Sequence, residues 1–378
     1  MMLWDGQEFE ASLRRIAEFG LEDCIGANDC MRACPVNRLH VNQNELDSVM
    51  ASGVWTERVK TFVTECVQCG DCTLACPAQA QRDHMMLLLK SRLPDIPKSW
   101  KTYVNLKGRR DREWLISLSN IMARRRVGPM GKYVDKRSLE QKALLFYFGC
   151  YIFSPSGSPL ATLKLADRIG LDYEVLAGLR SCCGWPQYLM GRMGFAQQML
   201  IHLGELIDQV RPEVIVSGCA ECYVALLRLK KKTTARWLPL TTPEWLLRHA
   251  DKLTWNRLDQ PIAYHDSCHI SKKVGHPQPA RDLLALMADI VELTESAQQS
   301  LCCGYYNIHA NPELNHELHL KKLQAVQEKG ATGMAVECVT CWESFIETFE
   351  QANVPVWDLM VMAEEFTRPA GHPTEAEV

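Results

Sequence analysis

The chain has 378 residues, enough for two or three domains, and 47% of them are hydrophobic, as expected for a globular protein with buried cores. Its formal net charge of −3 argues against a general nucleic-acid-binding protein, and no run of 18 uncharged apolar residues predicts a membrane-spanning helix. The 17 cysteines come without a recognisable secretion signal, and in a reducing compartment clustered cysteines are more often metal ligands than disulfides. We therefore expect a cytoplasmic metalloprotein that binds no nucleic acid.

A short amphipathic helix is expected over residues 7–20, and two cysteine boxes follow it. The second box, Cys66-Val-Gln-Cys69-Gly-Asp-Cys72-Thr-Leu-Ala-Cys76-Pro77, has the C-x2-C-x2-C-x3-C-P spacing of bacterial ferredoxins. In such a run the first three cysteines share one cubane, and the cysteine before proline binds the other cluster. Zinc knuckles rarely have this three-plus-one arrangement. The pattern predicts a 4Fe–4S cubane on Cys66, Cys69, Cys72 and Cys34, and a second cluster on Cys24, Cys30 and Cys76.

The first box, Cys24-Ile-Gly-Ala27-Asn-Asp29-Cys30-Met-Arg-Ala-Cys34-Pro35, departs from this pattern because Ala27 stands where a cysteine belongs. A methyl group cannot bind iron, so three interpretations are open. The cluster is 3Fe–4S, or it is 4Fe–4S with water or Asp29 on the open iron, or Ala27 is an introduced substitution that weakens the site. The sequence favours a three-cysteine cluster, either 3Fe–4S or an incomplete, labile 4Fe–4S.

The stretch between the boxes, residues 44–64, has a helical apolar pattern. This long separation resembles the helical ferredoxin domain of succinate dehydrogenase iron–sulfur subunits. After the second box, residues 90–142 hold 15 Lys/Arg against 5 Asp/Glu. Such a basic connector is either a docking face for an acidic partner or membrane surface, or a solvated helix face.

The rest of the chain repeats one cysteine pattern twice. A single cysteine is followed by an adjacent pair with glycine and then by a C-x2-C turn. Corresponding positions are offset by 118 to 120 residues, which indicates a duplicated unit. The two sets of five are Cys150, Cys182, Cys183, Cys219 and Cys222, and Cys268, Cys302, Cys303, Cys338 and Cys341.

Strand and helix patterns alternate in both repeats, which predicts parallel α/β domains. In the first repeat we expect strands over 143–150, 173–176 and 213–219, with helices over 159–169 and 195–210. In the second we expect strands over 261–268, 290–293 and 333–338, with helices over 279–288 and 314–328. Ligands of such domains bind at the carboxyl ends of the strands, so the topology should bring the five sulfurs of each repeat together.

The C-x31/33-C-C-G-x33/34-C-x2-C pattern resembles the cysteine-rich CCG domain of heterodisulfide reductases, and the ferredoxin boxes before it extend the resemblance to the catalytic iron–sulfur subunit of that family. The chain is also similar to the iron–sulfur subunits of glycolate oxidase and anaerobic glycerol-3-phosphate dehydrogenase. The implied fold class is a helical ferredoxin domain plus two duplicated α/β CCG domains with parallel sheets. The expected division is a ferredoxin domain over 1–95, a basic connector over 96–142, CCG domains over 143–258 and 259–370, and a flexible tail over 371–378.

The resemblance implies that each complete quintet binds a noncubane 4Fe–4S cluster, and that the two clusters together reduce a small-molecule disulfide or similar thiol-level substrate. His265 and His269 flank Cys268 and are weak candidates for proton donors; hydrogen bonding that supports the cysteine is the stronger interpretation. The expected partners are a flavoprotein, a membrane cytochrome subunit, or both, which could hold the chain at the inner face of the membrane. The alternative function is a non-catalytic electron relay between a flavoprotein dehydrogenase and a quinone, cytochrome b or other carrier.

Overall fold

The computed structural model describes residues 24–94, 125, 127–234, 236–308 and 310–369. The helix expected over 7–20 and most of the basic connector lie outside these ranges. The chain divides into two compact units. The first unit comprises Met1–Glu113, Gly184–Ile201 and Leu301–Leu318, and the second comprises Trp114–Cys183, His202–Ser300 and His319–Val378. Within the described residues, no helix combines the length and the apolar character needed to cross a membrane.

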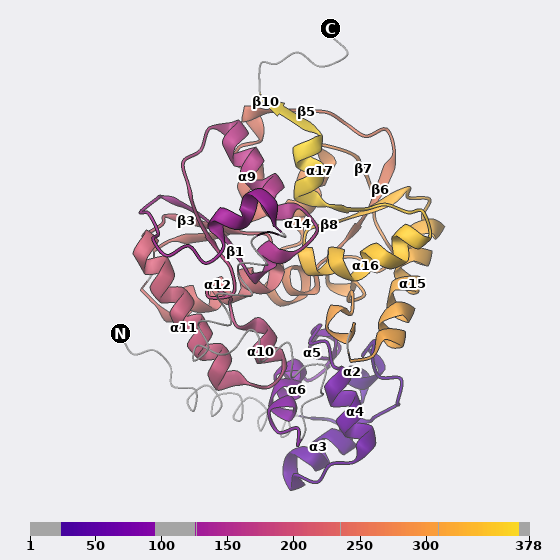
Figure 1. The fold of residues 1–378 in the computed structure, drawn as a ribbon. Coiled ribbons are helices and arrows are strands. Elements are labelled where there is room, and N and C mark those ends of the chain that lie inside the picture. Colours follow the sequence, from indigo (N-terminus) through magenta and orange to yellow (C-terminus); the bar gives the residue numbers. More distant parts are fainter. Residues whose placement is uncertain (1–23, 95–124, 126, 235, 309, 370–378) are drawn as a thin grey trace. The chain divides into compact units, whose positions relative to one another are not determined.

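The amino-terminal part of the first unit is helical (Figure 1). Its helices are α2 (Asp29–Arg32), α3 (Gln43–Ser52), α4 (Glu57–Glu65), α5 (Asp71–Leu74) and α6 (Arg82–Ser91). The single helical stretch expected over 44–64 is two helices. Gly53 ends α3 with φ of 71°, and Thr56 caps α4 by accepting a hydrogen bond from the backbone of Val59.

Two short segments from the repeats complete the first unit. One holds α10 (Trp185–Leu189) and the start of α11 (Met193–Val210), and α10 packs on α6. The other holds the 3-10 turn Tyr305–Asn307 and the start of α15 (Pro312–Glu328). The residues that follow each Cys-Cys pair therefore belong to the same unit as the ferredoxin boxes.

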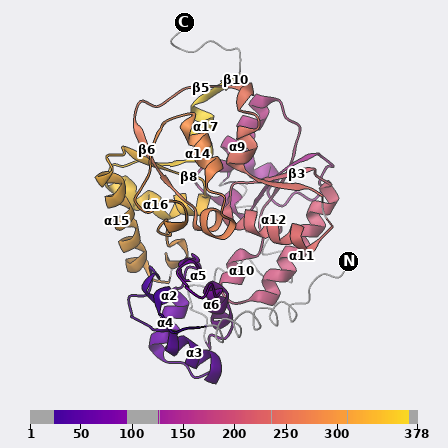
Figure 2. The same cartoon turned by 180° about the vertical axis from the view of Figure 1, so that it is seen from behind.

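The second unit contains two parallel sheets with the same strand order, which matches the duplication in the sequence (Figures 1 and 2). The first sheet has the order β2-β1-β3-β4, and the second has the order β7-β6-β8-β9. Their strands are β1 (Leu144–Gly149), β2 (Glu174–Ala177), β3 (Val214–Ser217) and β4 (Leu238–Thr241), and β6 (Pro261–His265), β7 (Asp289–Val291), β8 (Gly333–Val336) and β9 (Val356–Asp358).

Helices alternate with these strands, so the expected mixture of helix and parallel sheet is confirmed. The first repeat has α9 (Ser158–Ile169), α12 (Ala220–Lys232) and α13 (Thr242–Leu247), and the second has α14 (Gln278–Ala285), α16 (Val339–Gln351) and α17 (Leu359–Glu365). Further 3-10 turns cover Gly128–Tyr133, Cys150–Phe153, Ala250–Lys252 and Ala297–Gln299. A π-helical turn, His269–Val274, starts directly after Cys268.

Within the second unit, the last helix of each repeat packs on a helix of the other repeat. Helix α17 of the second repeat packs on α9 of the first, and α13 of the first repeat packs on α14 of the second. The strands β5 (Leu253–Trp255) and β10 (Thr367–Pro369) form an antiparallel ribbon. Arg168 on α9 fixes the returning segment, because its guanidinium donates to the carboxylate of Glu364 at 2.9 Å and to the hydroxyl of Thr367 at 2.6 Å.

Candidate iron–sulfur sites

The first cysteine box lines a pocket in the first unit. Cys24, Cys30 and Cys76 all border this pocket, and Ala27 borders it too. Asp29, one of the candidate ligands for an open iron, forms an ion pair with the guanidinium of Arg32 at the surface. Asp29 also borders this pocket, so the three-cysteine cluster and the cluster with Asp29 or water on the open iron both stay predictions.

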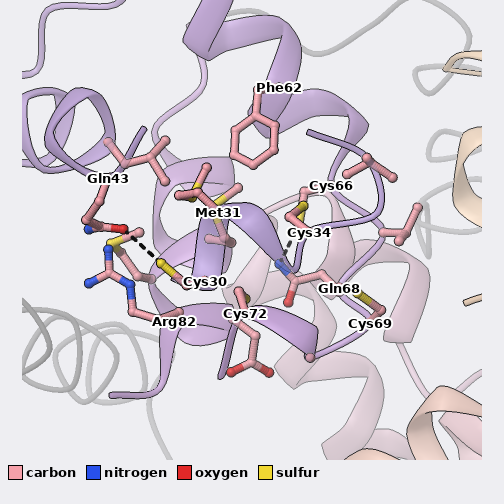
Figure 3. A pocket seen from close by; sticks show the side chains of 17 residues that line it. Cys30, Met31, Cys34, Gln43, Phe62, Cys66, Gln68, Cys69, Cys72 and Arg82 are labelled. Atoms are coloured by element: carbon pink, nitrogen blue, oxygen red, sulfur yellow. Dashed lines mark hydrogen bonds between the residues drawn. The ribbon is translucent and has the colours of Figure 1, made fainter. Parts of the chain in front are cut away.

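The second box lines an adjoining pocket with two cysteines from the first (Figure 3). The cysteines that border it are Cys30, Cys34, Cys66, Cys69 and Cys72. Burial and the neighbouring Cys66 raise the pKa of the Cys34 thiol to about 12. Such a thiol loses its proton only when a metal compensates the charge of the thiolate. The structure thus brings together the four residues expected to hold the cubane.

The five cysteines of the first repeat gather in the second unit. The Sγ atoms of Cys150 and Cys182 are 3.6 Å apart, close to the roughly 3.7 Å between two thiolates on one tetrahedral metal with bonds of about 2.3 Å. Hydrogen bonds from Cys182 and Cys222 lower the pKa of the Cys183 thiol to about 6. Burial and nearby Glu221 raise the pKa of Cys219, while a hydrogen bond from Cys222 opposes this rise. Soft thiolate donors at this spacing fit an iron–sulfur cluster.

Two buried tyrosines that the sequence analysis missed support this group. The hydroxyl of Tyr147 donates to the carbonyl of Ser181 at 2.7 Å, which fixes the loop before the Cys182-Cys183 pair. The hydroxyl of Tyr151 accepts from the backbone amide of Gly218 at 2.9 Å, which fixes the loop before Cys219. Aromatic residues inside an apolar strand pattern gave no signal for this role.

The glycine of each Cys-Cys-Gly motif is required by geometry. Gly184 has φ of 81° and Gly304 has φ of 73°, a region that residues with a side chain rarely adopt. A Cβ at position 184 would lie 2.6 Å from the carbonyl oxygen of Ala196. A Cβ at position 304 would meet the side chain of Asn315. The motif therefore turns sharply after its two cysteines and packs closely against a helix.

The second quintet is divided between the units. Cys268, Cys338 and Cys341 lie in the second unit and are buried, whereas Cys302 and Cys303 lie in the first. The Cys302 sulfur accepts from the backbone amide of Gly304 at 3.4 Å. The meeting of all five sulfurs at one cluster stays a prediction.

The two C-x2-C turns lie side by side in the second unit, and Glu221 lies between them. The Sγ of Cys219 donates to the Glu221 carboxylate at 3.0 Å, and the Sγ of Cys338 is 3.9 Å from the same oxygen. Thr340, which corresponds to Glu221 in the second repeat, donates to the other carboxylate oxygen at 3.3 Å. Glu221 is only 4% exposed. A carboxylate inside a C-x2-C turn is a signal that sequence reasoning could have used.

Known protein families match all three cysteine-rich parts. Residues 144–227 and 262–345 each match the cysteine-rich CCG domain, and residues 23–80 match the 4Fe–4S dicluster domain. The chain is an iron–sulfur protein with one dicluster domain and two CCG domains. The resemblance to heterodisulfide reductase subunits that was drawn from the cysteine spacing is confirmed.

Several curated proteins are similar to the chain at low identity. The D subunit of the dihydromethanophenazine:CoB–CoM heterodisulfide reductase of Methanosarcina acetivorans is 22% identical over 82% of this chain and 79% of its own length. The B subunit of the fumarate reductase (CoM/CoB) of Methanothermobacter marburgensis is 21% identical over 55% of this chain and 42% of its own. Lactate utilization protein A of Halalkalibacterium halodurans is 26% identical over 45% of this chain and 74% of its own.

The two histidines near Cys268 in the second CCG domain are both buried. The Nδ1 of His269 is 3.4 Å from the Cys268 sulfur, so this ring lies within hydrogen-bonding reach of the expected ligand. The ring of His265 packs edge-on against Phe345, with the centroids 4.8 Å apart. His269 is thus the histidine whose ring contacts the cysteine, while His265 forms part of the aromatic core.

The CCG loop of the second repeat contacts the dicluster domain inside the first unit. Asn307 donates to the backbone carbonyl of Glu65 at 2.8 Å, and Asn311 donates to the Glu65 carboxylate at 2.6 Å. Glu65 is 4% exposed and also pairs with Arg38 at 3.1 Å. Because Glu65 directly precedes Cys66, these contacts join the second box to the loop that carries Cys302 and Cys303.

Proposed function

We propose that the chain is the iron–sulfur subunit of a heterodisulfide-reductase-type enzyme that reduces a small-molecule disulfide or a related thiol-level substrate. In this proposal all 17 cysteines are cluster ligands, in four sets. Cys34, Cys66, Cys69 and Cys72 hold a 4Fe–4S cubane, Cys24, Cys30 and Cys76 hold a three-cysteine cluster, and each CCG quintet holds a noncubane 4Fe–4S cluster. The clusters supply one-electron transfer and iron that accepts a substrate thiolate.

The contact around Glu221 is the observation that carries this proposal. Reducing a disulfide takes two electrons and releases two thiols, so two adjacent metal sites can each take one sulfur. Glu221 contacts Cys219 of one CCG domain and Cys338 and Thr340 of the other, which keeps the two C-x2-C turns next to one another. His269 lies at the Cys268 side, where its ring can hydrogen-bond the cysteine sulfur.

The proposal also needs a path for electrons from the dicluster domain. A chain of covalent and hydrogen bonds leads from Cys66 to the second CCG loop. The carbonyl of Glu65, in the peptide bond to Cys66, accepts from the side-chain amide of Asn307. The backbone N–H of Asn307 in turn donates to the carbonyl of Gly304 at 2.7 Å. Gly304 directly follows Cys303. Electrons would enter through a flavoprotein, a membrane cytochrome subunit, or both, and such partners would place the chain at the inner face of the membrane.

A second candidate function is a non-catalytic relay between a flavoprotein dehydrogenase and a quinone, cytochrome b or other carrier. The relatives support this second candidate, because their names include a fumarate reductase subunit and a lactate utilization protein as well as heterodisulfide reductases. In that function the CCG domains pass electrons and bind no disulfide.

Turnover by the isolated chain distinguishes the two functions. The protein is purified without oxygen, reduced with a viologen, and given the mixed disulfide of coenzyme M and coenzyme B. Steady oxidation of the viologen, with release of two thiols per two electrons, is the expected result. A Cys183→Ser variant and a Cys338→Ser variant, one in each quintet, should each abolish turnover.

A relay gives a different outcome. Viologen-reduced protein would then leave every tested disulfide intact, but a quinone would reoxidise it in the presence of a partner subunit. Full turnover by either serine variant would contradict the assignment of one substrate sulfur to each CCG domain.

A further inference from the structure

A buried carboxylate follows an inner strand of the second CCG sheet. Asp266 comes directly after β6, and its side chain is 1% exposed. The guanidinium of Arg281 on α14 donates to both carboxylate oxygens, at 2.7 Å each. Such a two-bond pair compensates the buried charge and also fixes the direction in which the carboxylate points. The pair lies at the strand end that leads to Cys268, two residues further on.

Arg281 is itself fixed by its other neighbours. Its Nε donates to the carboxylate of Glu292 at 2.6 Å, and its Nη1 donates to the carbonyl of Pro277 at 3.1 Å. The guanidinium also lies over the ring of Tyr264, 4.9 Å from the ring centre. A cation held by two carboxylates and an aromatic ring has little freedom to move. The orientation of the Asp266 carboxylate is therefore set by a network and not by one side chain.

The same aspartate holds the segment that leads to the Cys302-Cys303 pair. Its Oδ2 accepts from the backbone amide of Ala297 at 2.6 Å, and its carbonyl accepts from the hydroxyl of Ser300 at 3.2 Å. Ser300 is 1% exposed, and it is the last residue of the second unit before the chain enters the first at Leu301. Two residues span at most about 7 Å, so the cysteine pair begins within that distance of a point that Asp266 fixes.

The first repeat ties its corresponding loop with different side chains. At the 118-residue offset between the repeats, Phe148 takes the place of Asp266. The neighbouring Tyr147 holds the loop instead, since its hydroxyl donates to the carbonyl of Ser181, directly before the Cys182-Cys183 pair. A link at the same place in both repeats, made by different side chains, indicates that each repeat needs this loop tied to the end of its strand.

We propose that Asp266 is a positioning residue for the noncubane cluster of the second quintet, because it ties the strand end before Cys268 to the Cys302-Cys303 loop. The inference rests on the proposed function, which assigns this quintet to one cluster. The quintet is divided between the two units, so its sulfurs need such a link to reach the same irons. Asp266 acts through the backbone that carries these ligands, and losing a supporting partner of this kind costs about 10- to 100-fold in metal affinity.

A chelator titration followed by EPR and iron analysis tests this on the full chain, purified without oxygen and partly reduced. Cys183→Ser and Cys338→Ser identify the signals of the first-quintet and second-quintet clusters by removing one each. Asp266→Asn keeps the size of the side chain but loses the charge and one acceptor oxygen. The chelator concentration that removes half of the second-quintet signal should fall at least about tenfold. The g values of that signal should shift, while the first-quintet signal stays unchanged.

Tyr147→Phe is the matched control, because it removes the corresponding link of the first repeat and leaves Asp266 intact. It should weaken the first-quintet cluster and leave the second-quintet cluster unchanged, the reverse of Asp266→Asn. Arg168→Lys is the structural control, because Arg168 pairs with the carboxylate of Glu364, which lies in the same unit and follows the last cysteine of the chain. It should lower the unfolding temperature and leave both signals unchanged.

Ser300→Ala is a milder variant that keeps the buried ion pair. It removes only the hydroxyl that donates to the Asp266 carbonyl. It should weaken the second-quintet cluster alone, by less than Asp266→Asn does, and it decides the matter if Asp266→Asn does not fold.

The outcomes separate this inference from the function on which it rests. If Asp266→Asn lowers the unfolding temperature as Arg168→Lys does but leaves the second-quintet signal as in the wild type, the inference is wrong and the cluster assignment stands. Equal weakening of both clusters would also contradict it, because the link belongs to one repeat. If Cys338→Ser removes no iron, the proposed assignment of that quintet fails, and the inference fails with it.

Discussion

Ala27 decides, at the scale of single residues, which cluster the first box can hold. It borders the same pocket as Cys24, Cys30 and Cys76, so a side chain at this position faces the expected cluster. Ala27→Cys should convert a three-cysteine site into a four-cysteine site. The EPR signal of an oxidised 3Fe–4S cluster should then disappear, and iron content should rise by about one atom per chain. An unchanged spectrum would mean that position 27 does not reach the cluster.

Glu65 is the residue through which the CCG loop contacts the dicluster domain, and its contacts give a stability prediction. Asn311→Ala removes one donor from a buried carboxylate and should cost about 1–3 kcal/mol in the free energy of unfolding. Gln324→Ala is the control, because Gln324 also bonds a glutamate, Glu328, but at the surface, where the cost should be about 0.3 kcal/mol. Thermal unfolding of the anaerobic proteins measures both. Equal losses would show that the Glu65 contact contributes nothing special.

The sequence could predict the cysteines but not the residues that surround them. Iron–sulfur ligands are recognised by chain spacing alone, because short loops must bring several thiolates to one cluster. Gln43 and Glu65 act only through their positions in the fold: Gln43 Oε1 accepts from the Cys30 sulfur at 3.5 Å, and Glu65 accepts from Asn307 and Asn311. Charged or amide side chains in helices are usually solvated, so their burial could be learned only from the structure.

At the scale of elements, the glycine of each Cys-Cys-Gly motif ends the loop in a positive-φ conformation that residues with a side chain rarely adopt. Gly184→Ala should destabilise the protein by more than about 2 kcal/mol, since it combines the strain of positive φ with a clash against the backbone of Ala196. Gly170→Ala is the matched control, because Gly170 has φ of 79° but open space around it. It should cost only about 1 kcal/mol. The unfolding temperatures of the two variants test this order, and the reverse order would contradict it.

Asp358 caps α17 and gives a pH dependence. Its carboxylate accepts from the backbone amides of Met360 and Val361, and burial raises its pKa to about 7. In the unfolded chain the Asp358 carboxyl loses its proton near pH 4, whereas in the folded protein this carboxyl stays protonated until about pH 7. The protonated Asp358 carboxyl therefore contributes to the free energy of unfolding below about pH 4, and this contribution is lost as pH rises from about 4 to about 7.

Asp358→Asn keeps a good cap and removes the ionisation. The unfolding temperature of this variant, relative to that of the wild type, should rise between about pH 5 and pH 7 and then level off. Glu337, whose pKa burial raises to about 8, contributes a similar slope to both proteins, so it cancels in the comparison. A difference that stays constant with pH would show that Asp358 is ionised in the folded protein.

Sequence patterns predicted most of the repeated strands and helices within a few residues, because apolar runs and helical periodicity mark buried elements. They missed the break at Gly53 between α3 and α4, where the apolar pattern continues across a turn. They also missed the ribbon of β5 and β10, because strands of three residues carry no periodicity. The π-helical turn after Cys268 is likewise invisible in the sequence, and turns of this kind are frequent at functional sites.

At the scale of the whole molecule, iron should stabilise the fold. Ten of the 17 cysteines belong to the CCG quintets, and all of those except Cys150 are buried. Anaerobic protein with every cluster in place should contain about fifteen irons per chain. Removing them with a chelator leaves buried thiols without a metal, so the unfolding temperature should fall markedly. Stoichiometric zinc in place of iron, or a chelated protein as stable as the loaded one, would contradict the assignment of the quintets.

The reciprocal packing of α17 on α9 and of α13 on α14 has a consequence for how such a chain could arise. Each repeat receives its covering helix from its neighbour, so one repeat alone would leave an apolar surface bare. Two identical copies could cover one another through the same pair of contacts, as in a symmetric homodimer. Gene duplication would then have tied an ancestral dimer into a single polypeptide. Once joined, the halves were free to diverge, which is how one could acquire Glu221 while the other carries Thr340 at the corresponding position.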